Sequence, residues 1–545
     1  MTAARKRLIL AAAILGTTVV TVDSTVVNVA LPAIERDLGG GLAGQQWTSN
    51  AYLVTLASLL LIGGSLGDIF GERRVFATGV VLFGVTSAVC AVAPTIGVLV
   101  AGRALQGVAG ALLSPAALAV IVSAFPPDER GAAVGSWTAW AGIGTVLGPL
   151  IGGQLVDSAS WRWIFVINLP ILVVTFVMIL RVVPAGARSE VRTKIDVRGA
   201  LLCALGLAGV SFGLIEQPLR GFGDPMVLGT LVGGVVLFAG FIAWERRAPA
   251  PMLPLDLFKR RNFAIGNVET FAMYAGLGLL FFFLILFLQQ VAGFSAIEAG
   301  TATLPVTIVM FLLSKRFGAL ADRLGPRLFM GIGPIVAALG LLLFVRLDAH
   351  VNYLTDLLPG LLLFSLGLSV TVAPLTATVL ADADEHNAGI ASAVNNAIAR
   401  TAGLVAIAAV GTLVAAQFSH SLESRLGRSA SRPEVARAVK QAEKQPLAVV
   451  KATGSPPAIA RRVERSAKQA SVSAFRLGMG ISAGLVALGG VLALVGITNP
   501  RRQLDASACP GGQLAGVPRE GAGQSPCDWG QDHKLPLVSA RLHPT

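Results

Sequence analysis

Apolar stretches of about 20 residues recur along this chain from Leu8 to Ile497, each long enough to cross a hydrocarbon core of about 30 Å as an α-helix. A helix pairs its own backbone N–H and C=O groups, and lipid chains offer these groups no hydrogen-bond partner. Composition agrees with a membrane environment, because 54% of the 545 residues are hydrophobic and only 13% are charged, whereas soluble proteins are about 45 to 50% apolar. We therefore predict an all-α integral membrane protein.

These stretches predict fourteen spans. Their approximate bounds are 8–31, 47–67, 75–93, 97–124, 131–155, 161–183, 199–217, 225–244, 263–290, 298–317, 328–346, 354–380, 389–417 and 473–497. The basic residues before Leu8 resemble the head of a signal peptide, but further spans follow and no small-residue cleavage site ends the first, so it is interpreted as an uncleaved span.

Basic residues predict the orientation. Lys and Arg lie between the spans, and alternate short connections are basic, so the net charge of +13 does not indicate a nucleic-acid partner. The positive-inside rule then predicts a multi-pass protein of the cell (plasma) membrane with both termini in the cytoplasm. The basic connections contain Arg73, Arg74, Arg130, Arg188, Arg192, Lys194, Arg198, Arg246, Arg247, Lys259, Arg260, Arg261, Arg323 and Arg327.

Two inner connections repeat one pattern, "GGSLGDIFGERRVF" (63–76) and "FGALADRLGPRLFM" (317–330). An internal repeat indicates two structurally related halves. The matching residues are Gly64, Leu66, Asp68, Gly71 and Arg73 in the first copy, and Gly318, Leu320, Asp322, Gly325 and Arg327 in the second.

The repeat predicts a domain organisation. Residues 1–183 and 263–497 form the two six-helix halves, 184–262 contain two inserted helices, and the Gly- and Pro-rich residues 498–545 form a disordered cytoplasmic tail. The second half includes an outer loop, 418–472, in which Ser-Pro starts predict short amphipathic helices over the outer mouth.

An acidic residue interrupts the first span in "TVVTVDSTVVNVALP" (18–32). Asp23 lies about 12 Å below the outer surface at 1.5 Å per residue, and Arg103 of the fourth span lies about 9 Å below it. Charged residues at such depth face a partner or a cavity. One interpretation is a static ion pair. The other is proton coupling, in which burial favours the neutral Asp23 carboxyl and the approach of Arg103 expels its proton.

In the two repeated connections, Gly71 and Gly325 allow a tight turn, and Asp68 and Asp322 can cap a helix or pair with a base. Arg73 and Arg74 are placed to meet acidic residues of "PPDERG" (126–131), namely Asp128 and Glu129. The alternative is a solvated, positive-inside loop without a gating role.

The fifth span contains "GTVLGPLIGG", with Gly144, Gly148, Pro149, Gly152 and Gly153. Small residues let helices approach closely, and proline removes a backbone hydrogen bond and bends the axis. Tight packing alone explains the pattern, and a conformational pivot is the second interpretation.

Further ionisable residues lie within spans. Glu269 is either a residue near the inner interface or a site that attracts cationic substrate or relays protons. Arg400 lies near the middle of span thirteen with Asn395 and Asn396 one turn away, which makes that helix face polar. An apolar cavity between the halves is expected to be lined by aromatic residues such as Tyr52, Trp137, Trp140, Phe271, Tyr274 and Phe281.

These motifs together resemble the major facilitator superfamily, and within it the fourteen-span drug:proton antiporter family. The repeated loop resembles the inner-loop motif, "LVAGRALQGVAGA" (99–111) the fourth-helix motif, and "GTVLGPLIGGQL" (144–155) the fifth-helix antiporter motif. The opening stretch, "WRWIFVINLP" (161–170) and "GIASAVNNAIARTAG" (389–403) resemble motifs of the fourteen-span group. The resemblance implies two pseudo-symmetric six-helix halves plus two inserted helices, proton coupling at Asp23 and Arg103, and an inner-loop latch.

The predicted function is a proton-coupled antiporter that exports amphipathic drugs, antibiotics or related lipophilic compounds by alternating access. No G-x-x-x-x-G-K-[ST] loop occurs in the sequence, so an ion gradient is the expected energy source. The expected partners are a small lipophilic substrate, protons and the lipid bilayer, with no cofactor or metal. Alternatives are a dedicated exporter of one natural product, a proton-coupled uptake symporter, and a membrane-embedded lipid enzyme.

Overall fold

The computed structural model describes residues 2–184, 196–249, 251–381, 388–427 and 457–499, together with Val435, Val439 and Leu447. The predicted tail and most of the 428–456 segment lie outside the described residues. So do some side chains within helices, including those of Asp68 and Asp322.

The described chain is helical and contains no strand. The first half contains α1 (Ala3–Leu38), α2 (Gly41–Phe70), α3 (Glu72–Ala91), α4 (Ile96–Ala124), α5 (Pro127–Ser158), α6 (Trp163–Val166) and α7 (Asn168–Val182). Two helices follow, α8 (Val197–Arg220) and α9 (Pro225–Glu245), and then the short η1 (Leu255–Lys259). The second half contains α10 (Arg261–Gln290), α11 (Ala296–Ala302), α12 (Leu304–Leu324), α13 (Pro326–Phe344), η2 (Tyr353–Leu357), α14 (Leu358–Ala381), α15 (Ala388–Leu426) and α17 (Pro457–Gly496).

Twelve helical segments of the described chain are long and apolar enough to cross a membrane. Helices α2 and α5 are not among the twelve, although they are 30 and 32 residues long. The chain is thus an integral, multi-pass membrane protein, and the count of fourteen spans stays a prediction.

Side-chain caps fix several helix starts where the sequence offers a short polar residue. Asp196 and Asp224 accept backbone hydrogen bonds at the starts of α8 and α9, at 2.8 Å in both cases. Ser295 and Glu298 form a capping box at the start of α11. Such caps satisfy backbone N–H groups that the first helical turn leaves unpaired.

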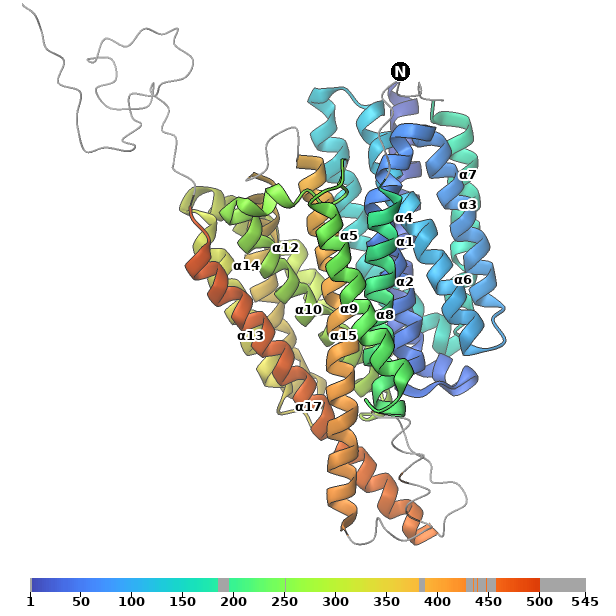
Figure 1. Ribbon diagram of the computed structural model, residues 1–545, viewed down its shortest axis with the longest axis vertical. Helices are drawn as coiled ribbons and strands as arrows, with labels where there is room; N and C mark the ends of the chain where they lie inside the picture. Colours follow the sequence, from blue (N-terminus) through green and yellow to red (C-terminus); the bar gives the residue numbers. More distant parts are fainter. Residues whose placement is uncertain are drawn as a thin grey trace, which may run out of the picture. The chain divides into compact units, whose positions relative to one another are not determined.

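Helices α1 to α7 and helices α10 to α17, which the sequence repeat predicts to be two halves, meet at one end. We call the end at which α1 begins the N-terminal end, and the opposite end, where α1 finishes at Leu38, the far end. Helices α13 and α17 lean away from α1 to α7 toward the N-terminal end (Figure 1). A large apolar cluster joins the halves through residues of the far half of α1, such as Val26 and Ala30, and α10 residues such as Leu279 and Phe282.

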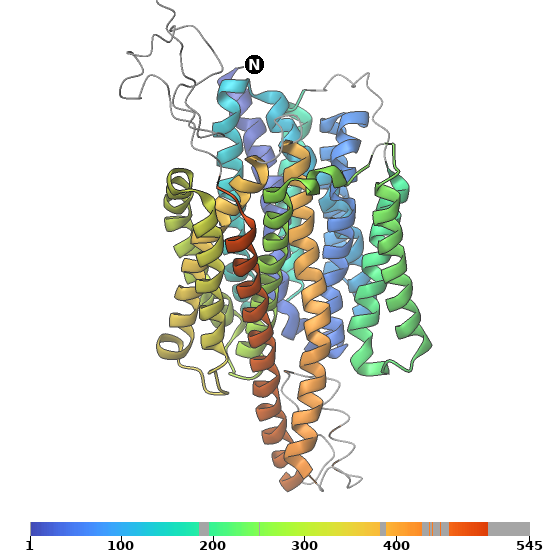
Figure 2. The ribbon, with the colours of Figure 1, turned by 60° about the vertical axis from the view of Figure 1, so that its left-hand side comes forward.

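Helices α8 and α9 pack side by side against the edge where the halves meet (Figure 2). Leu214 of α8 accepts a hydrogen bond from Thr412 of α15 at 2.6 Å, and Glu216 of α8 accepts one from Trp47 of α2 at 3.4 Å. The inserted pair therefore contacts both halves at once.

The predicted bounds of the outer loop, 418 and 472, are both wrong. Helix α15 continues to Leu426, and residues 457–472, expected to start in a separate short helix over the mouth, form the first turns of the continuous 40-residue α17. Arg425 donates to Gln469 at 2.6 Å, so the two extensions pair with each other beyond the bundle (Figure 2). Both extensions are helical, so each satisfies its own backbone groups, and most of the first predicted short helix (431–445) lies outside the described residues.

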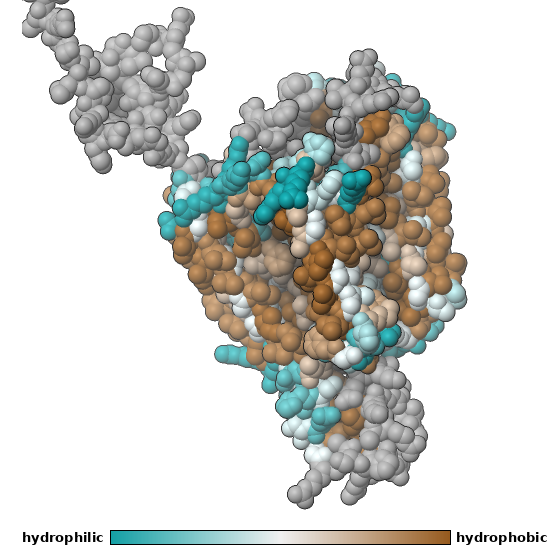
Figure 3. Space-filling view, viewed as in Figure 1, coloured by the Kyte–Doolittle hydropathy of each residue, from teal (hydrophilic) through white to brown (hydrophobic). Residues whose placement is uncertain are grey.

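The outer surface has an apolar band with hydrophilic residues at its borders (Figure 3). Exposed apolar side chains of α8 and α9, such as Leu201, Leu205, Val232 and Val236, belong to the lateral surface. Such a large exposed apolar area suits contact with lipid chains.

Candidate functional site

Asp23 and Arg103 form a buried ion pair between α1 and α4. The distance from Arg103 Nη1 to Asp23 Oδ2 is 2.5 Å, and the two side chains are 0% and 1% exposed. Their contact confirms that the two charges lie at one depth, as residue counting along the spans suggested. The proposed role in proton coupling stays a prediction.

Three polar side chains complete a network around the pair. Gln106 donates to Asp23 Oδ1 at 3.0 Å and accepts from Arg103 Nη1 at 2.6 Å. Asn168 of α7 donates to the same Asp23 oxygen at 3.1 Å, and Ser87 of α3 accepts from Gln106 at 2.9 Å. The network therefore ties four helices to one carboxylate.

Sequence reasoning assigned no role to Gln106, Asn168 or Ser87. A signal was present for two of them, because Gln106 follows Arg103 by one helical turn and Asn168 is the polar residue in the apolar part of "WRWIFVINLP". The other end of that motif binds the end of α1, since Trp161 donates to Asp37 at 2.9 Å and Arg162 forms a salt bridge with Asp37. The motif thus fixes α1 at two depths.

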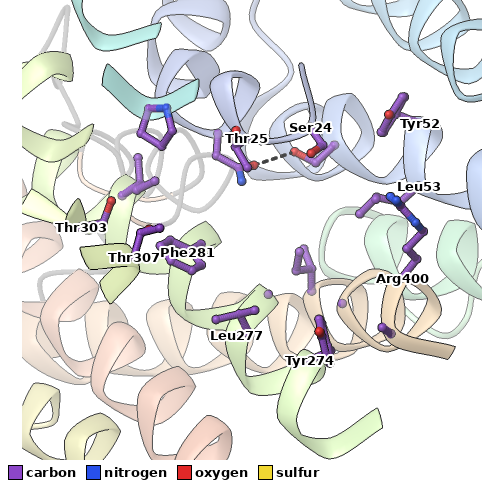
Figure 4. A pocket seen from close by; sticks show the side chains of 18 of the residues that line it. Ser24, Thr25, Tyr52, Leu53, Tyr274, Leu277, Phe281, Thr303, Thr307 and Arg400 are labelled. Atoms are coloured by element: carbon purple, nitrogen blue, oxygen red, sulfur yellow. Dashed lines mark hydrogen bonds between the residues drawn. The ribbon is translucent and has the colours of Figure 1, made fainter. Parts of the chain in front are cut away.

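A cavity of about 340 Å³ lies between the halves. Polar residues of α1, such as Ser24 and Asn28, line one side, and Tyr274, Leu277 and Phe281 of α10 line the other (Figure 4). Among the six aromatic residues predicted to line it, Tyr52, Tyr274 and Phe281 do so. Trp137 instead donates to Thr17 at 2.9 Å, and Trp140 and Phe271 are exposed, 48% and 39%.

Arg103 belongs to both the buried network and the cavity wall. Its guanidinium carbon lies 4.3 Å from the centre of the Tyr52 ring, and Tyr52 also lines the cavity. Asp23 lies behind them and is not part of the wall. Arg103 therefore contacts both the cavity and the Asp23 carboxylate.

Two of the predicted residues on α15 face the cavity and one does not. Arg400 and Asn396 line it, and the Arg400 side chain extends from α15 toward the side formed by α2 (Figure 4). Asn395 turns to α10, where it donates to Asn267 at 3.1 Å and Thr270 at 2.7 Å. A helix face that looked uniformly polar in sequence is thus divided between the cavity and the packing of the second half.

Glu269 reaches neither the surface of the protein, as a residue at the membrane–water interface would, nor the cavity wall. It is 0% exposed, and neither carboxyl oxygen has a hydrogen-bond partner among the described residues. The α17 backbone at Gly489 packs against the Glu269 backbone. The interface interpretation is therefore wrong, because α17 covers this part of α10.

The glycines of α5 serve two different contacts. Side chains added at Gly144, Gly148 and Gly152 would meet α1, for instance Thr25 Oγ1 at 2.0 Å from a Cβ at Gly148. A Cβ at Gly153 would lie 2.5 Å from Ile297 Cα of α11, in the other half. Close packing is therefore present on both sides of this helix, and the pivot role stays a prediction.

Several further contacts close the far end between the halves. The Pro149 carbonyl lies 2.5 Å from a Cβ built at Gly300. Asp157 of α5 accepts the backbone N–H groups of Ala296 and Ile297 at 3.1 and 2.8 Å, so it caps α11 across the interface. Gln46 of α2 also donates to the Ile407 carbonyl of α15 at 2.7 Å.

The repeated connections share their backbone geometry. Gly71 and Gly325 follow the last residues of α2 and α12 with φ of 91° and 88°, which confirms the predicted tight turns. The same glycines occupy the N-cap positions of α3 and α13, and the predicted capping by Asp68 and Asp322 stays a prediction. The side chains of both aspartates lie outside the described residues.

Among the described residues, the predicted contact of Arg73 with Glu129 is not formed. Arg73 donates to the Leu180 carbonyl at 2.6 Å, and Glu129 pairs with Lys6 at 2.7 Å. In the second half, Arg327 donates to the Leu494 carbonyl at 2.6 Å. The two matching arginines therefore both bind the carbonyl end of the last helix in their half, which the sequence could not show. The alternative Asp128 contact lies outside the described side chains, and Gly64 and Gly318 lie within α2 and α12.

Comparison with known proteins identifies the family. The model of the Major Facilitator Superfamily matches residues 13–408. The chain belongs to the major facilitator superfamily. As a member of this superfamily it is a membrane transporter and not an enzyme, and its fold is the all-helical major-facilitator fold.

Curated superfamily relatives cover most of this chain. The puromycin resistance protein pur8 of Streptomyces alboniger is 37% identical over 72% of this chain and 79% of its own length. The tetracenomycin C resistance and export protein of Streptomyces glaucescens is 35% identical, over 75% and 76%. The multidrug resistance protein Stp of Mycobacterium tuberculosis is 32% identical, over 77% and 78%.

Solved structures support the same superfamily fold. A bacterial homologue of the human lysosomal transporter Spinster aligns with a TM-score of 0.63 and 16% identity, covering 92% of this chain and 100% of that one. The peptide transporter PepTSo aligns with a TM-score of 0.58 and 14% identity, covering 90% and 97%. At this identity the likeness concerns the fold alone.

Proposed function

We propose that this superfamily member is a proton-coupled antiporter of the plasma membrane that exports amphipathic antibiotics or related lipophilic compounds. The relatives named for puromycin, tetracenomycin C and multidrug resistance support the cargo class. A cavity between two halves, with polar groups on one wall and aromatic rings on the other, suits amphipathic molecules. The fourteen-span drug:proton antiporter family is the proposed subfamily.

The proposed transport cycle is alternating access by rocking of the two halves. Both termini lie in the cytoplasm in this proposal, as the basic connections favour. The N-terminal end then faces the cytoplasm, and closure of the far end by Asp157, Gly153 and Gln46 corresponds to an inward-open conformation. Substrate would enter from the cytoplasmic side and leave once the far-end contacts separate.

Asp23 is the proposed proton carrier. Its carboxylate accepts hydrogen bonds from Arg103, Gln106 and Asn168. When a proton arrives, the neutral carboxyl loses its attraction for Arg103, and the guanidinium is free to turn toward the cavity. When Arg103 returns, the proton is expelled. The single observation that carries this proposal is the contact of one arginine with both the buried acid and the cavity.

A second candidate function is a dedicated exporter of one natural product. Two relatives carry the name of a single compound in an export or transport role, the tetracenomycin C protein and a probable actinorhodin transporter of Streptomyces coelicolor, which is 36% identical over 76% of this chain. The two candidates differ only in the breadth of cargo.

Transport into inside-out membrane vesicles tests the proposal. Puromycin and tetracenomycin C are supplied outside, a proton gradient is imposed by respiration, and uptake is measured by mass spectrometry. We expect uptake of at least one compound that collapses with a protonophore and is absent from vesicles carrying Asp23→Asn. Uptake that persists without a gradient, or in the variant, would contradict proton coupling. Uptake of one compound only favours the dedicated exporter.

A further inference from the structure

The wall of the central cavity contains two arginines, one of which is paired with a carboxylate behind the wall. Its charged residues are Arg103 and Arg400, and no aspartate or glutamate is among the described residues that line it. The polar remainder consists of hydroxyl and amide groups, such as Ser24, Asn28 and Asn396. The described lining residues therefore give the cavity a positive charge at Arg400.

The two arginines differ in their partners. Arg103 is neutralised by Asp23, and its Nε also donates to the Thr48 carbonyl at 3.2 Å. Arg400 has neither a salt bridge nor a hydrogen bond in the part of the chain that the structure describes, and its buried Nε is without an acceptor. A guanidinium presents five donors and stays charged, so an unpaired one inside a protein favours an anionic acceptor.

The nearby carboxylate does not supply this acceptor. Glu269 lies on α10, which packs against α15, but its backbone contacts α17 and its oxygens have no partner among the described residues. The hydrogen bonds of Asn395 with Asn267 and Thr270 occupy the interface between α10 and α15. Arg400 therefore keeps its charge directed to the cavity.

We propose that Arg400 is a binding residue for an acidic group of the transported molecule, and that the preferred cargo is an amphipathic organic anion. The carboxylate or ionised phenol of the cargo binds the guanidinium, which can contact two oxygens at once. Its ring system packs against Tyr274, Leu277 and Phe281, which line the same cavity. This inference deepens the proposed export function and rests on it for the direction of transport, but not for binding.

The proposal predicts a charge order among cargo molecules of one shape. A cation would meet the unpaired Arg400 guanidinium and no carboxylate among the described lining residues, and a neutral molecule would leave the Arg400 donors unpaired. An anion satisfies both requirements. Burial within the protein strengthens this preference relative to water.

Binding to the purified full chain in nanodiscs, without any gradient, tests the inference. The probes share one ring system: pyrene-1-butyrate, its methyl ester and pyrenebutyl-trimethylammonium. We expect the anion to bind about 10- to 100-fold more tightly than the ester, as a charge-assisted hydrogen bond provides, and the ammonium compound to bind most weakly. In Arg400→Gln the anion is expected to bind no better than the ester, and Arg400→Lys is expected to restore part of the difference.

The control is Arg346→Gln, which removes the same charge from an exposed position outside the cavity wall. It is expected to keep the wild-type order. Retained ester binding in Arg400→Gln shows that the variant is folded. The inference is overturned if the ester or the ammonium compound binds wild type as tightly as the anion, or if Arg400→Gln keeps the anion preference. Failure of gradient-driven uptake in vesicles with an intact charge order would reject the proposed transport cycle and leave the binding site standing.

Discussion

The guanidinium of Arg103 stands between the Asp23 carboxylate and the central cavity. Arg103 lines the cavity and contacts Asp23 at 2.5 Å, while Asp23 is fully buried behind it. The Arg103 side chain therefore contacts both the cavity proposed to hold cargo and the Asp23 carboxylate proposed to hold a proton. A structural ion pair would need no such connection.

The first prediction concerns the coupling energy of this pair. Asp23→Asn and Arg103→Gln each leave one buried group without its partner, so each is expected to lower the free energy of unfolding by about 3 to 5 kcal/mol. The double variant is expected to lose less than the sum of the two losses, because it leaves no isolated charge. Unfolding in mixed micelles with increasing SDS measures all four free energies.

A matched control for this cycle is the Lys6–Glu129 pair, where Glu129 is 47% exposed. The variants Lys6→Gln and Glu129→Gln are expected to couple by less than about 1 kcal/mol, because water screens an exposed pair. Additive losses for Asp23→Asn and Arg103→Gln would show that the two buried groups do not depend on each other.

The second prediction concerns closure of the far end. In Gly153→Ala, the new Cβ would lie 2.5 Å from Ile297 Cα, a backbone atom that cannot move without separating the halves. Such overpacking costs about 1 to 3 kcal/mol in the closed state, which shifts the population about 5- to 150-fold toward an open far end. Spin labels at the exposed positions Ser158 and Glu298 are expected to report longer distances.

The spin labels require a chain in which Cys509 and Cys527 are replaced by serine, since Cys90 and Cys203 are buried. Gly229→Ala is the control, because no heavy atom lies within 4 Å of a Cβ at that position of α9. Its distances are expected to match those of the parent chain. An unchanged distribution in Gly153→Ala would mean that α5 and α11 do not hold the far end together.

The third prediction concerns the turn of the first repeated connection. Gly71 has a φ of 91°, so Gly71→Ala places a Cβ in the left-handed region and is expected to cost about 1 to 2 kcal/mol of the free energy of unfolding. Gly484 lies within α17 with nothing within 4 Å of an added Cβ, so Gly484→Ala is expected to stabilise by up to about 1 kcal/mol. Opposite shifts of the thermal midpoint would support the assigned geometry, and equal shifts would not.

The fourth prediction separates stability from transport at Glu269. Its buried oxygens have no partner among the described residues, so Glu269→Met is expected to raise the free energy of unfolding by about 1 to 3 kcal/mol. Glu245 is the matched buried residue, but it accepts the Leu253 N–H at 2.8 Å, so Glu245→Met is expected to destabilise. Urea-assisted thermal unfolding in detergent measures both variants.

Vesicle uptake with Glu269→Met then tests the relay hypothesis. A stabilised protein with lost gradient-driven uptake would assign Glu269 a part in proton movement, as an unpaired buried acid in a transporter suggests. A stabilised protein with normal uptake would show that the Glu269 carboxyl has no part in transport and is only a buried polar group that the fold tolerates. A destabilised Glu269→Met would show that the carboxyl has a partner in the folded protein.

Local sequence decided the secondary structure and much of the membrane arrangement. Apolar runs of about 20 residues predict helices in lipid because a helix of that length crosses the membrane with its backbone groups paired internally, and that prediction holds along the described chain. The repeated glycines Gly71 and Gly325 predicted the turns correctly, since a tight connection of this kind requires positive φ. Depth along two antiparallel helices was also sufficient to place Asp23 and Arg103 at a similar level, and their contact came from the structure.

Tertiary structure alone decided which polar groups meet. Helical periodicity places Asn395, Asn396 and Arg400 on neighbouring faces, but only the packing of α10 against α15 sends Asn395 into that interface and Arg400 into the cavity. Burial of Glu269 depends on α17, which follows more than 180 residues later in the chain. A sequence records how far apart such residues are along one helix, whereas the environment of a side chain depends on helices brought together by long-range packing.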